Sequence, residues 1–383
     1  MRILIDFTQI PIARAGVGVY AENLTREMVC CLDSSDLLFV LVQSDEKSLP
    51  DRLQSNDRIR FITIPSLIFR NRYLLFAFEQ LVLPFLLLIC RVHMIHSLHY
   101  THPLICPCRR VVTIHDLTHF LFPELHTRKN RLIMPFFVRR AMHHADAVIF
   151  ISESTRKDAE RLIPGGRVVG VVIPHGVDPR YTVQTSPKEV CAALERLHLS
   201  RPFILNVGTV EPRKNLLRLI HAFNELADHR HDICLVLAGK LGWHYSEILA
   251  QINGSRHAKR IHQVGFITDD EKRALLNSCE VFVYPSLYEG FGLPVLEAMA
   301  AGAPVITSTN SSLAEVAGDA AELVDPASIP DLSNAIAGLL ADEAKKNRLR
   351  AAGKSRSSLF TWADTARNTY CLYRRLNSNL SNL

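Results

Sequence analysis

The chain has 383 residues, of which 48% are hydrophobic and 21% are charged, and its formal net charge is +6. This length is too great for one typical domain and suits two, while the composition is that of a soluble globular protein. The mild positive charge favours anionic partners such as phosphates or an acidic membrane surface. It is too weak and too scattered to indicate a nucleic-acid-binding protein.

Apolar, strand-like runs alternate with helical patterns along the whole sequence. One series extends from RILIDF at the N-terminus to ADAVIFIS, and a second from RPFILNVGTV to AAELVD. Such alternation predicts parallel sheets covered by helices. We therefore expect an α/β protein with two doubly wound, Rossmann-like domains, residues 1–180 and 201–360, a linker at 181–200 and a terminal helix at 361–383. Ligands of such folds bind at the carboxyl ends of the strands, here in the cleft between the domains.

The loop after the first strand contains Gly16, Gly18 and Ala21, a spacing that imitates a dinucleotide-binding fingerprint. Such a match is weak evidence, and the connection from the strand to Gly16 is longer than the tight turn that this motif requires. A nicotinamide-dependent oxidoreductase is therefore a distant alternative.

The most apolar stretch is YLLFAFEQLVLPFLLLICRVHMIHS, residues 73–97, which Glu79 and Pro84 interrupt. The run after Pro84 is shorter than the ~20 residues that a membrane-spanning helix needs. We expect a buried helix that continues into the strand VHMIHS, with a peripheral membrane contact as the alternative.

Cysteine usage indicates the compartment. The nine cysteines are irregularly spaced, and the start, MRILIDFTQI, has the pattern of a strand rather than of a secretory signal. Free thiols in a reducing cytoplasm are therefore expected.

The run VVTIHDLTHFLFPE ends a predicted strand with His115 and Asp116. An α/β fold keeps its chemistry at this end of its strands. His115 and His119 also have a spacing that can bind zinc on a helix, but no third ligand is evident and no metal is expected.

The run NVGTVEPRKN places Arg213 and Lys214 after another strand, where they are expected to open the next helix. Two cations at a helix start are unfavourable for the helix dipole, and a bound anion would compensate for them.

The run YEGFGLPVLEAMAAG follows the strand EVFVYPS. A proline in the first turn and a glycine just past the end predict a short helix over 294–301. The first N–H groups of this helix, with those of Phe291, Gly292 and Leu293, are expected to bind an anion, above all phosphate. Gly290 and Gly292 allow a ligand to approach the backbone closely.

Two acids flank this run. Glu289 lies in the loop before the helix and Glu297 one turn inside it, so they need not share one proton. They are expected to hold different parts of one elongated ligand, because carboxylates accept hydrogen bonds from sugar and ribose hydroxyls. The plain alternative makes Glu297 a dipole-complementing residue and Glu289 a solvated loop acid.

The stretch EGFGLPVLEAMAAGAPVITS resembles the Glu–seven residues–Glu signature of retaining glycosyltransferases, above all family 4, which has the GT-B fold. The TIHDL…FPE and VGTVEPRKN runs are similar to those of bacterial O-antigen and polysaccharide mannosyltransferases. The resemblance spans nearly the whole chain. It implies two facing doubly wound domains, a deep cleft between them and a C-terminal helix that crosses back to the first domain.

The resemblance also implies roles for individual residues. Glu289 would contact the donor sugar and Glu297 the ribose, while Arg213 and Lys214 would clamp the diphosphate and neutralise the leaving group. His115 would contact the sugar hydroxyls, and Asp116 would orient it or bind acceptor. The remaining donor contacts would come from Gly16, Gly208, Thr209, Gly265, Phe266, Gly290, Phe291, Gly292 and Leu293. Many family members have Arg where this chain has Thr209, which puts one phosphate contact in doubt, and Arg213 with Lys214 would have to carry more of the binding.

The implied reaction moves a hexose, mannose or a GDP-linked deoxyhexose such as rhamnose, to a lipid-linked glycan in cell-surface polysaccharide synthesis (O-antigen, lipopolysaccharide or exopolysaccharide). No cofactor is expected beyond the nucleotide sugar, and no divalent metal, because the sequence has no Asp–any–Asp triplet. The expected location is the cytoplasm, with peripheral contact with the inner membrane left open. A UDP-sugar donor, a sugar-nucleotide epimerase and a non-catalytic scaffold are the alternatives.

Overall fold

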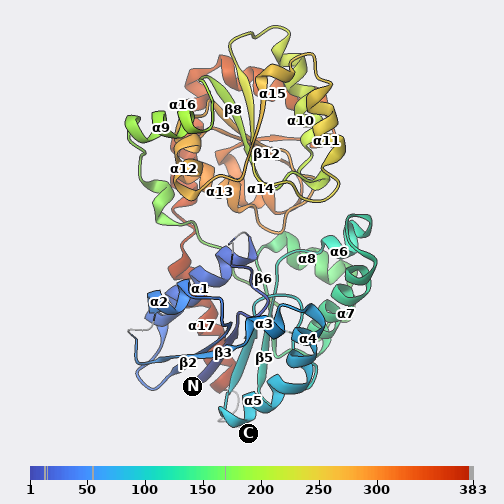
Figure 1. Cartoon of the computed structure of the whole chain (residues 1–383), viewed down its shortest axis with the longest axis vertical. Coiled ribbons are helices and arrows are strands. Elements are labelled where there is room, and N and C mark those ends of the chain that lie inside the picture. Colours follow the sequence, from blue (N-terminus) through green and yellow to red (C-terminus); the bar gives the residue numbers. More distant parts are fainter. Residues whose placement is uncertain (13, 15, 54–55, 169, 379–383) are drawn as a thin grey trace. The chain divides into compact units, whose positions relative to one another are not determined.

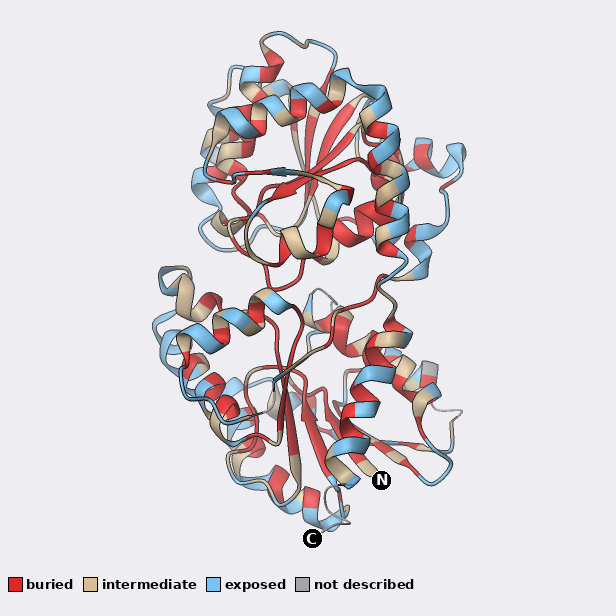
Figure 2. Cartoon of the chain, turned by 180° about the vertical axis from the view of Figure 1, so that it is seen from behind, coloured by how far each residue is buried: buried red, intermediate tan, exposed pale blue. Residues whose placement is uncertain are grey.

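The structure is a computed structural model that describes residues 1–383 except 13, 15, 54–55, 169 and 379–383. It divides into two compact units, Met1–Gly176 with Thr361–Leu383, and Val177–Phe360. Each unit has its own parallel sheet with helices around it (Figure 1). Buried residues concentrate in the strands and on the sides of the helices that face the sheets (Figure 2). The predicted architecture of two Rossmann-like units is confirmed.

The first unit contains a seven-stranded sheet in the order β3-β2-β1-β4-β5-β6-β7. Its strands are β1 (Arg2–Asp6), β2 (Leu37–Gln43), β3 (Ile59–Ile64), β4 (Met94–Ser97), β5 (Arg109–Ile114), β6 (Ala147–Phe150) and β7 (Gly170–Val172). The central strands are apolar runs buried on both faces, as parallel sheets require. The strand order reverses beside β1, which makes the carboxyl end of β1 the ligand-binding position of this topology.

The helices of the first unit are α1 (Val17–Cys31), α2 (Ser48–Leu53), α3 (Ser66–Phe69), α4 (Arg72–Ala77), η1 (Phe78–Val82), α5 (Leu83–Ile89), α6 (Thr118–Leu121), η2 (Pro123–Leu125), α7 (Arg128–His144), α8 (Glu153–Leu162) and α17 (Trp362–Ser378). The terminal helix α17 packs along α1. Its Tyr370 and Tyr373 hydrogen-bond to Asp36 and His96. The terminal helix therefore returns to the first unit, as predicted, although the last five residues of the predicted segment lie outside the described part.

The apolar segment 72–89 forms one continuous helix, α4–η1–α5, followed by β4. Its expected burial is wrong, because only 28% of it is buried. Its length and mean hydropathy of 1.7 are sufficient, by composition alone, for a helix that crosses a bilayer. The prediction of burial failed because the helix is apolar on two opposite faces, and only one of them faces the core.

The second unit contains a six-stranded parallel sheet in the order β10-β9-β8-β11-β12-β13. Its strands are β8 (Phe203–Val207), β9 (Cys234–Ala238), β10 (Ile261–Gly265), β11 (Val281–Tyr284), β12 (Val305–Ser308) and β13 (Glu322–Val324). The order reverses between β8 and β11, so the carboxyl ends of these two strands mark the ligand-binding edge.

The helices of the second unit are η3 (Pro179–Thr182), α9 (Pro187–Arg196), η4 (Pro212–Lys214), α10 (Leu216–Ala227), α11 (Ser246–Asn253), η5 (Ala258–Arg260), α12 (Asp269–Ser278), α13 (Leu293–Ala300), α14 (Ser311–Ala317), η6 (Gly318–Ala320), α15 (Ile329–Ala341) and α16 (Glu343–Ser357). The core lies between the sheet and helices such as α10 and α15, where Phe223 and Ile336 are fully buried.

The structure corrects the prediction of a linker at 181–200. This segment contains α9 and belongs to the second unit. Ser186 and Glu189 form a reciprocal capping box at the start of this helix. Val190 and Ala193 then pack against Ala274 of α12. The polar composition suggested a linker because a short surface helix needs only one narrow apolar stripe. The N-terminal segment of the first unit correspondingly ends at residue 176 rather than at the predicted residue 180.

Candidate functional site

The loop between β11 and α13 is the centre of the candidate site in the second unit. The helix predicted over 294–301 occupies Leu293–Ala300, one residue earlier at each end. Gly292 precedes it at φ +108°, and a Cβ there would lie 2.8 Å from Leu313 Cδ2. Only glycine therefore fits where the chain turns into the helix.

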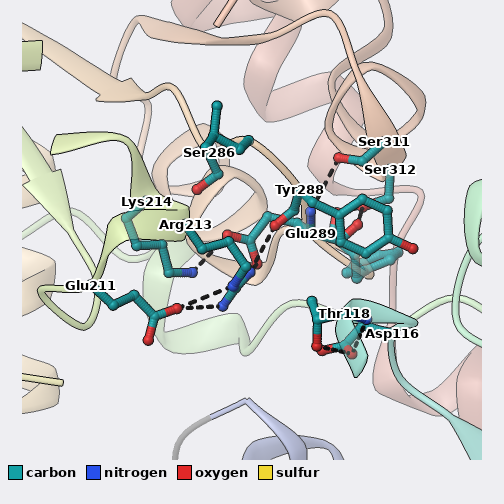
Figure 3. Close-up of polar contacts among 12 residues, drawn as sticks. Asp116, Thr118, Glu211, Arg213, Lys214, Ser286, Tyr288, Glu289, Ser311 and Ser312 are labelled. Carbon is teal, nitrogen blue, oxygen red and sulfur yellow. Dashed lines mark hydrogen bonds and ion pairs between the residues drawn. The ribbon is translucent and has the colours of Figure 1, made fainter. Parts of the chain in front are cut away.

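Glu289 binds two cations that come from a distant part of the sequence (Figure 3). Lys214 Nζ lies 2.6 Å from Oε1 of Glu289, and an Arg213 nitrogen lies 2.8 Å from Oε2. Tyr284, the last residue of β11, donates its hydroxyl to Oε1 at 3.1 Å and lies 2.6 Å from Lys214 Nζ. Arg213 also binds Glu211 at 2.8 Å. Two cations and two carboxylates are thus collected at the carboxyl ends of β8 and β11.

The local backbone corrects one prediction. Arg213 and Lys214 do not open a helix but lie in the 3-10 turn η4, and Asn215 follows in the left-handed conformation at φ 60°. The Asn215 side chain donates to the carbonyls of Pro285 and Pro326. The two cations are therefore balanced by carboxylates, and the helix-dipole argument made for them does not apply.

The charge state of the cluster follows from its burial. Burial opposes ionisation of Glu289, but the positive charges of Arg213 and Lys214 outweigh it and lower its pKa to about 2. Burial lowers the pKa of Lys214, and the Glu289 carboxylate partly offsets this. Burial also raises the pKa of Glu211, against the charge of Arg213. Glu289 is thus an ionised carboxylate at neutral pH and cannot supply a proton there.

Two serines hold the loop backbone and were missed by sequence reasoning. Ser312 Oγ lies 2.8 Å from the carbonyl oxygens of both Glu289 and Phe291, which share its one hydroxyl hydrogen, and Ser311 Oγ accepts from the Glu289 N–H at 3.2 Å (Figure 3). Ser311 and Ser312 begin α14, shortly after the carboxyl end of β12, and a polar pair past the end of a strand next to β11 could have been predicted to face this loop. The bonds to the carbonyls of Glu289 and Phe291 fix the peptide planes that carry the N–H groups of Gly290 and Gly292.

Glu297 has a separate partner. Lys272 Nζ lies 3.0 and 3.1 Å from its two carboxylate oxygens and 4.9 Å from the centre of the Tyr181 ring. Burial raises the pKa of Glu297, and the charge of Lys272 offsets only part of this effect. The two acids therefore do not share an ion-pair partner. Neither Lys272 nor Tyr181 was anticipated, because nothing in the local sequence links them to the helix α13.

The other residues of this unit that were predicted to bind the sugar-nucleotide donor lie at the carboxyl ends of β8 and β10. Gly208 and Thr209 follow β8, and the Gly208 N–H bonds to the carbonyl of Ala238 at 2.9 Å. Gly265 ends β10 at φ +74°, and the next side chain, Phe266, is 71% exposed. An exposed aromatic ring at the ligand-binding edge is available for stacking on a base.

The first unit contains the remaining predicted residues. Gly16 precedes α1 at φ +45°, and its carbonyl accepts the N–H of Tyr20. His115 follows β5, and its Nε2 lies 2.7 Å from the carbonyl of Leu98. Burial lowers the pKa of His115 to about 4, so the ring is neutral at pH 7 and donates through Nε2. Asp116 accepts from the N–H and the hydroxyl of Thr118, at 3.0 and 2.8 Å (Figure 3).

The histidine pair considered for zinc is not assembled into a metal centre. His119 stacks on His126, with 3.9 Å between the ring centres. Within the described residues, no group of three or more His, Cys, Asp or Glu side chains is arranged to hold a metal ion.

Known proteins are similar to this chain in both halves. Residues 14–181 match the family model described as Glycosyltransferase Family 4, and residues 195–356 match that described as Glycosyl transferases group 1. The chain is 31% identical over 272 residues to the O-antigen chain mannosyltransferase B of Escherichia coli. The matched region covers 70% of this chain and 71% of that protein.

Two further similarities are informative. The serotype-specific mannosyltransferase WbdA of Escherichia coli is 33% identical over 267 residues, 68% of this chain but only 32% of that longer protein. The crystal structure of Anabaena Alr3699/HepE in complex with UDP and glucose matches over all of both chains, with a TM-score of 0.73 and 20% identity. The latter likeness shows the fold.

Proposed function

We propose that this chain, a hexosyltransferase that belongs to glycosyltransferase family 4, transfers mannose from GDP-mannose to a lipid-linked glycan in the cytoplasm. The product would be a bacterial cell-surface polysaccharide such as an O-antigen or an exopolysaccharide. The relatives named as mannosyltransferases support the sugar. A GDP-linked deoxyhexose such as GDP-rhamnose is the nearest variant of this proposal.

The buried cluster of Arg213, Lys214 and Glu289 is the observation that carries the proposal. In it, the two cations stabilise the negative charge that develops on the leaving diphosphate, assisted by the amides at the start of α13. Fixed charges in a buried site need no reorganisation during the reaction. These groups would take the place of a divalent cation.

We assign the other parts of a sugar nucleotide to the remaining predicted residues. In our proposal Glu289 orients the sugar, and Glu297 with Lys272 binds the ribose. His115, neutral and fixed through Nε2, offers Nδ1 to a sugar hydroxyl, while Asp116 binds the acceptor. The sugar is transferred with retention, and an oxygen of the leaving phosphate accepts the proton of the acceptor hydroxyl.

Replacing Glu297 with Ala should weaken donor binding by about tenfold, which corresponds to ~1.4 kcal/mol. The loss should appear in the dissociation constant of the donor rather than in kcat, because the ribose does not take part in bond breaking. Isothermal titration with the sugar nucleotide measures it, and Glu343→Ala, an exposed acid of α16, is the control. Unchanged donor affinity would remove the ribose role.

The choice of donor is tested by a thermal-shift and transfer screen of GDP-, UDP-, ADP- and dTDP-sugars in the presence of EDTA. GDP-mannose should give the largest shift, and turnover should continue in EDTA. A preference for UDP-glucose would favour the alternative suggested by the UDP-bound structure of HepE. Loss of turnover in EDTA would contradict the metal-independent mechanism. Conversion of the donor without any acceptor would indicate an epimerase instead.

A further inference from the structure

Unlike an ordinary surface helix, the helix 72–89 is apolar on its outer side as well as on its inner side, and its acid points inward. Its acid, Glu79, is 1% exposed and accepts from Gln9 Nε2 at 2.6 Å and Thr101 Oγ1 at 2.7 Å. Gln80 also points inward and donates to the carbonyl of His102. The large apolar side chains on the outside of this helix and the preceding turn are Leu67, Ile68, Tyr73, Leu74, Phe76, Leu81, Val82, Phe85, Leu88 and Ile89.

The inner side of the same helix is an integral part of the first unit. Leu75, Phe78, Leu83 and Leu87 are buried in one cluster with the sheet residue Leu4. Burial of four such side chains, together with the hydrogen bonds of Glu79, fixes the helix to its unit. The helix therefore lies along the surface over roughly 27 Å, and crossing a bilayer would require this core to open.

Helix α7 extends the apolar surface. Phe76 of α4 packs edge-on against Phe137 of α7 at 5.8 Å, and Lys129 lies 4.8 Å from the centre of the Tyr73 ring. The exposed apolar side chains of α7 are Leu132, Ile133 and Phe136. We call these three, with the ten outer side chains named above, the apolar face. Contiguous apolar surface of this kind marks a membrane or protein contact.

The charge around the apolar face indicates which contact it is. Residues 66–97 contain a single acid, the buried Glu79, and residues 128–144 contain none. The exposed basic side chains of these two segments are Arg70, Arg72, Arg91, Arg128, Lys129, Arg131 and Arg139. Of these, Arg70 is paired with Asp45 of a neighbouring loop. An apolar face whose own segments carry exposed cations and no exposed acid is complementary to anionic lipid.

A cavity of about 960 Å³ adjoins this face within the same unit. Tyr73, Phe76 and Ile133 belong both to its lining and to the apolar face. Arg72, Arg128 and Lys129 of the same helices line it as well. Arg70 also lines it and is paired with Asp45 at 2.8 Å, and the carboxylates of Asp45 and Glu46, the latter paired with Arg14, complete the charged part of the lining. Gln9 and Thr101, the two residues that bind Glu79, also belong to its lining. The lining thus combines apolar side chains of the surface, charged side chains and hydrogen-bonding groups, and it includes Phe7 and Thr8 directly after β1.

We propose that the apolar face docks the first unit onto an anionic bilayer, with the helix 72–89 in the plane of the interface. The adjoining cavity takes the phosphate-bearing head of an amphipathic acceptor from that bilayer. The second step rests on the proposed function, since it assumes that the acceptor is lipid-linked. The first step depends only on the surface.

The docking is tested by vesicle flotation with the full chain. The wild type should float with phosphatidylcholine vesicles that contain phosphatidylglycerol, and about tenfold less with phosphatidylcholine alone, because basic side chains contribute to binding. The double variant Leu81→Asp/Phe85→Asp should lose binding by about tenfold or more, because charge is placed in the apolar contact. Leu359→Asp in the second unit is the matched control, since Leu359 is 67% exposed, Leu81 67% and Phe85 66%.

Two controls separate the outcomes. The double variant should keep its thermal unfolding midpoint and its transfer of sugar to a water-soluble glycan, because neither side chain lines the cavity. A wild type that does not float, or a double variant that floats equally well, overturns the docking. A mass by light scattering that falls from dimer to monomer in the variant also overturns it, because the face would then join two copies. If the wild type floats but transfers no sugar, the docking proposal stands and the proposed function is overturned.

Discussion

Replacing Lys214 with Met should lower kcat for sugar transfer by about 10³-fold, or ~4 kcal/mol. Lys214 is 8% exposed and lies 2.6 Å from Glu289, so its charge acts in a site from which water is largely excluded. A cation in such a site stabilises a developing phosphate charge far more than it does in water. Methionine keeps most of the side-chain volume and removes the charge, which separates catalysis from packing.

The measurement is steady-state transfer with the preferred donor, compared with Lys188→Met on the exposed side of α9. Glu289→Gln should also lose most activity, because Arg213 and Lys214 then lack the carboxylate that positions both of them. Both variants should remain folded, as judged by circular dichroism. A Lys214→Met enzyme within about threefold of the wild type would leave the leaving-group assignment without support, since ~0.7 kcal/mol is too small for a catalytic cation.

The sequence predicted the parts of this site better than their pairing. The strand ends, Gly292 and the start of α13 follow from local patterns, because glycine and proline fix the backbone where they stand. The ion pair of Lys214 with Glu289 joins residues far apart in the sequence. It depends on the η4 turn and on the left-handed Asn215, which redirect the two cations away from the next helix. The resemblance supplied roles for these residues, but not this contact.

Other features escaped prediction because they are decided by tertiary packing. Lys272 reaches Glu297 from α12, and Ser312 reaches the loop from α14. The apolar helix 72–89 shows the same limit, since a helix that is apolar on two faces has no pattern that tells inside from outside. Its buried Glu79 appeared in the sequence as an interruption, whereas in the structure it marks the inner face.

The free energy of unfolding should respond to pH in opposite senses at Glu289 and Glu297. The pKa of Glu289 is lowered from 4.5 to about 2, so its ionised form stabilises the fold above pH 4.5, and this contribution is lost as the pH falls towards 2. Its full size is about 3 kcal/mol. The pKa of Glu297 is raised above 4.5, so its contribution is complete below pH 4.5 and is lost as the pH rises through the raised value.

Urea unfolding of Glu289→Gln, Glu297→Gln and the wild type, between pH 7 and pH 3.5 and without donor, tests this difference. The deficit of Glu289→Gln relative to the wild type should shrink as the pH falls, because the wild type then loses the ionised carboxylate that the variant lacks. Glu297→Gln should instead gain relative to the wild type as the pH rises, because its neutral amide avoids the buried charge. Glu195→Gln, on the exposed side of α9, corrects for the loss of one surface carboxylate. If both site variants show the same sign of slope, the two acids lie in equivalent electrostatic surroundings. Separate roles for them at the two ends of one donor would then lose their physical basis.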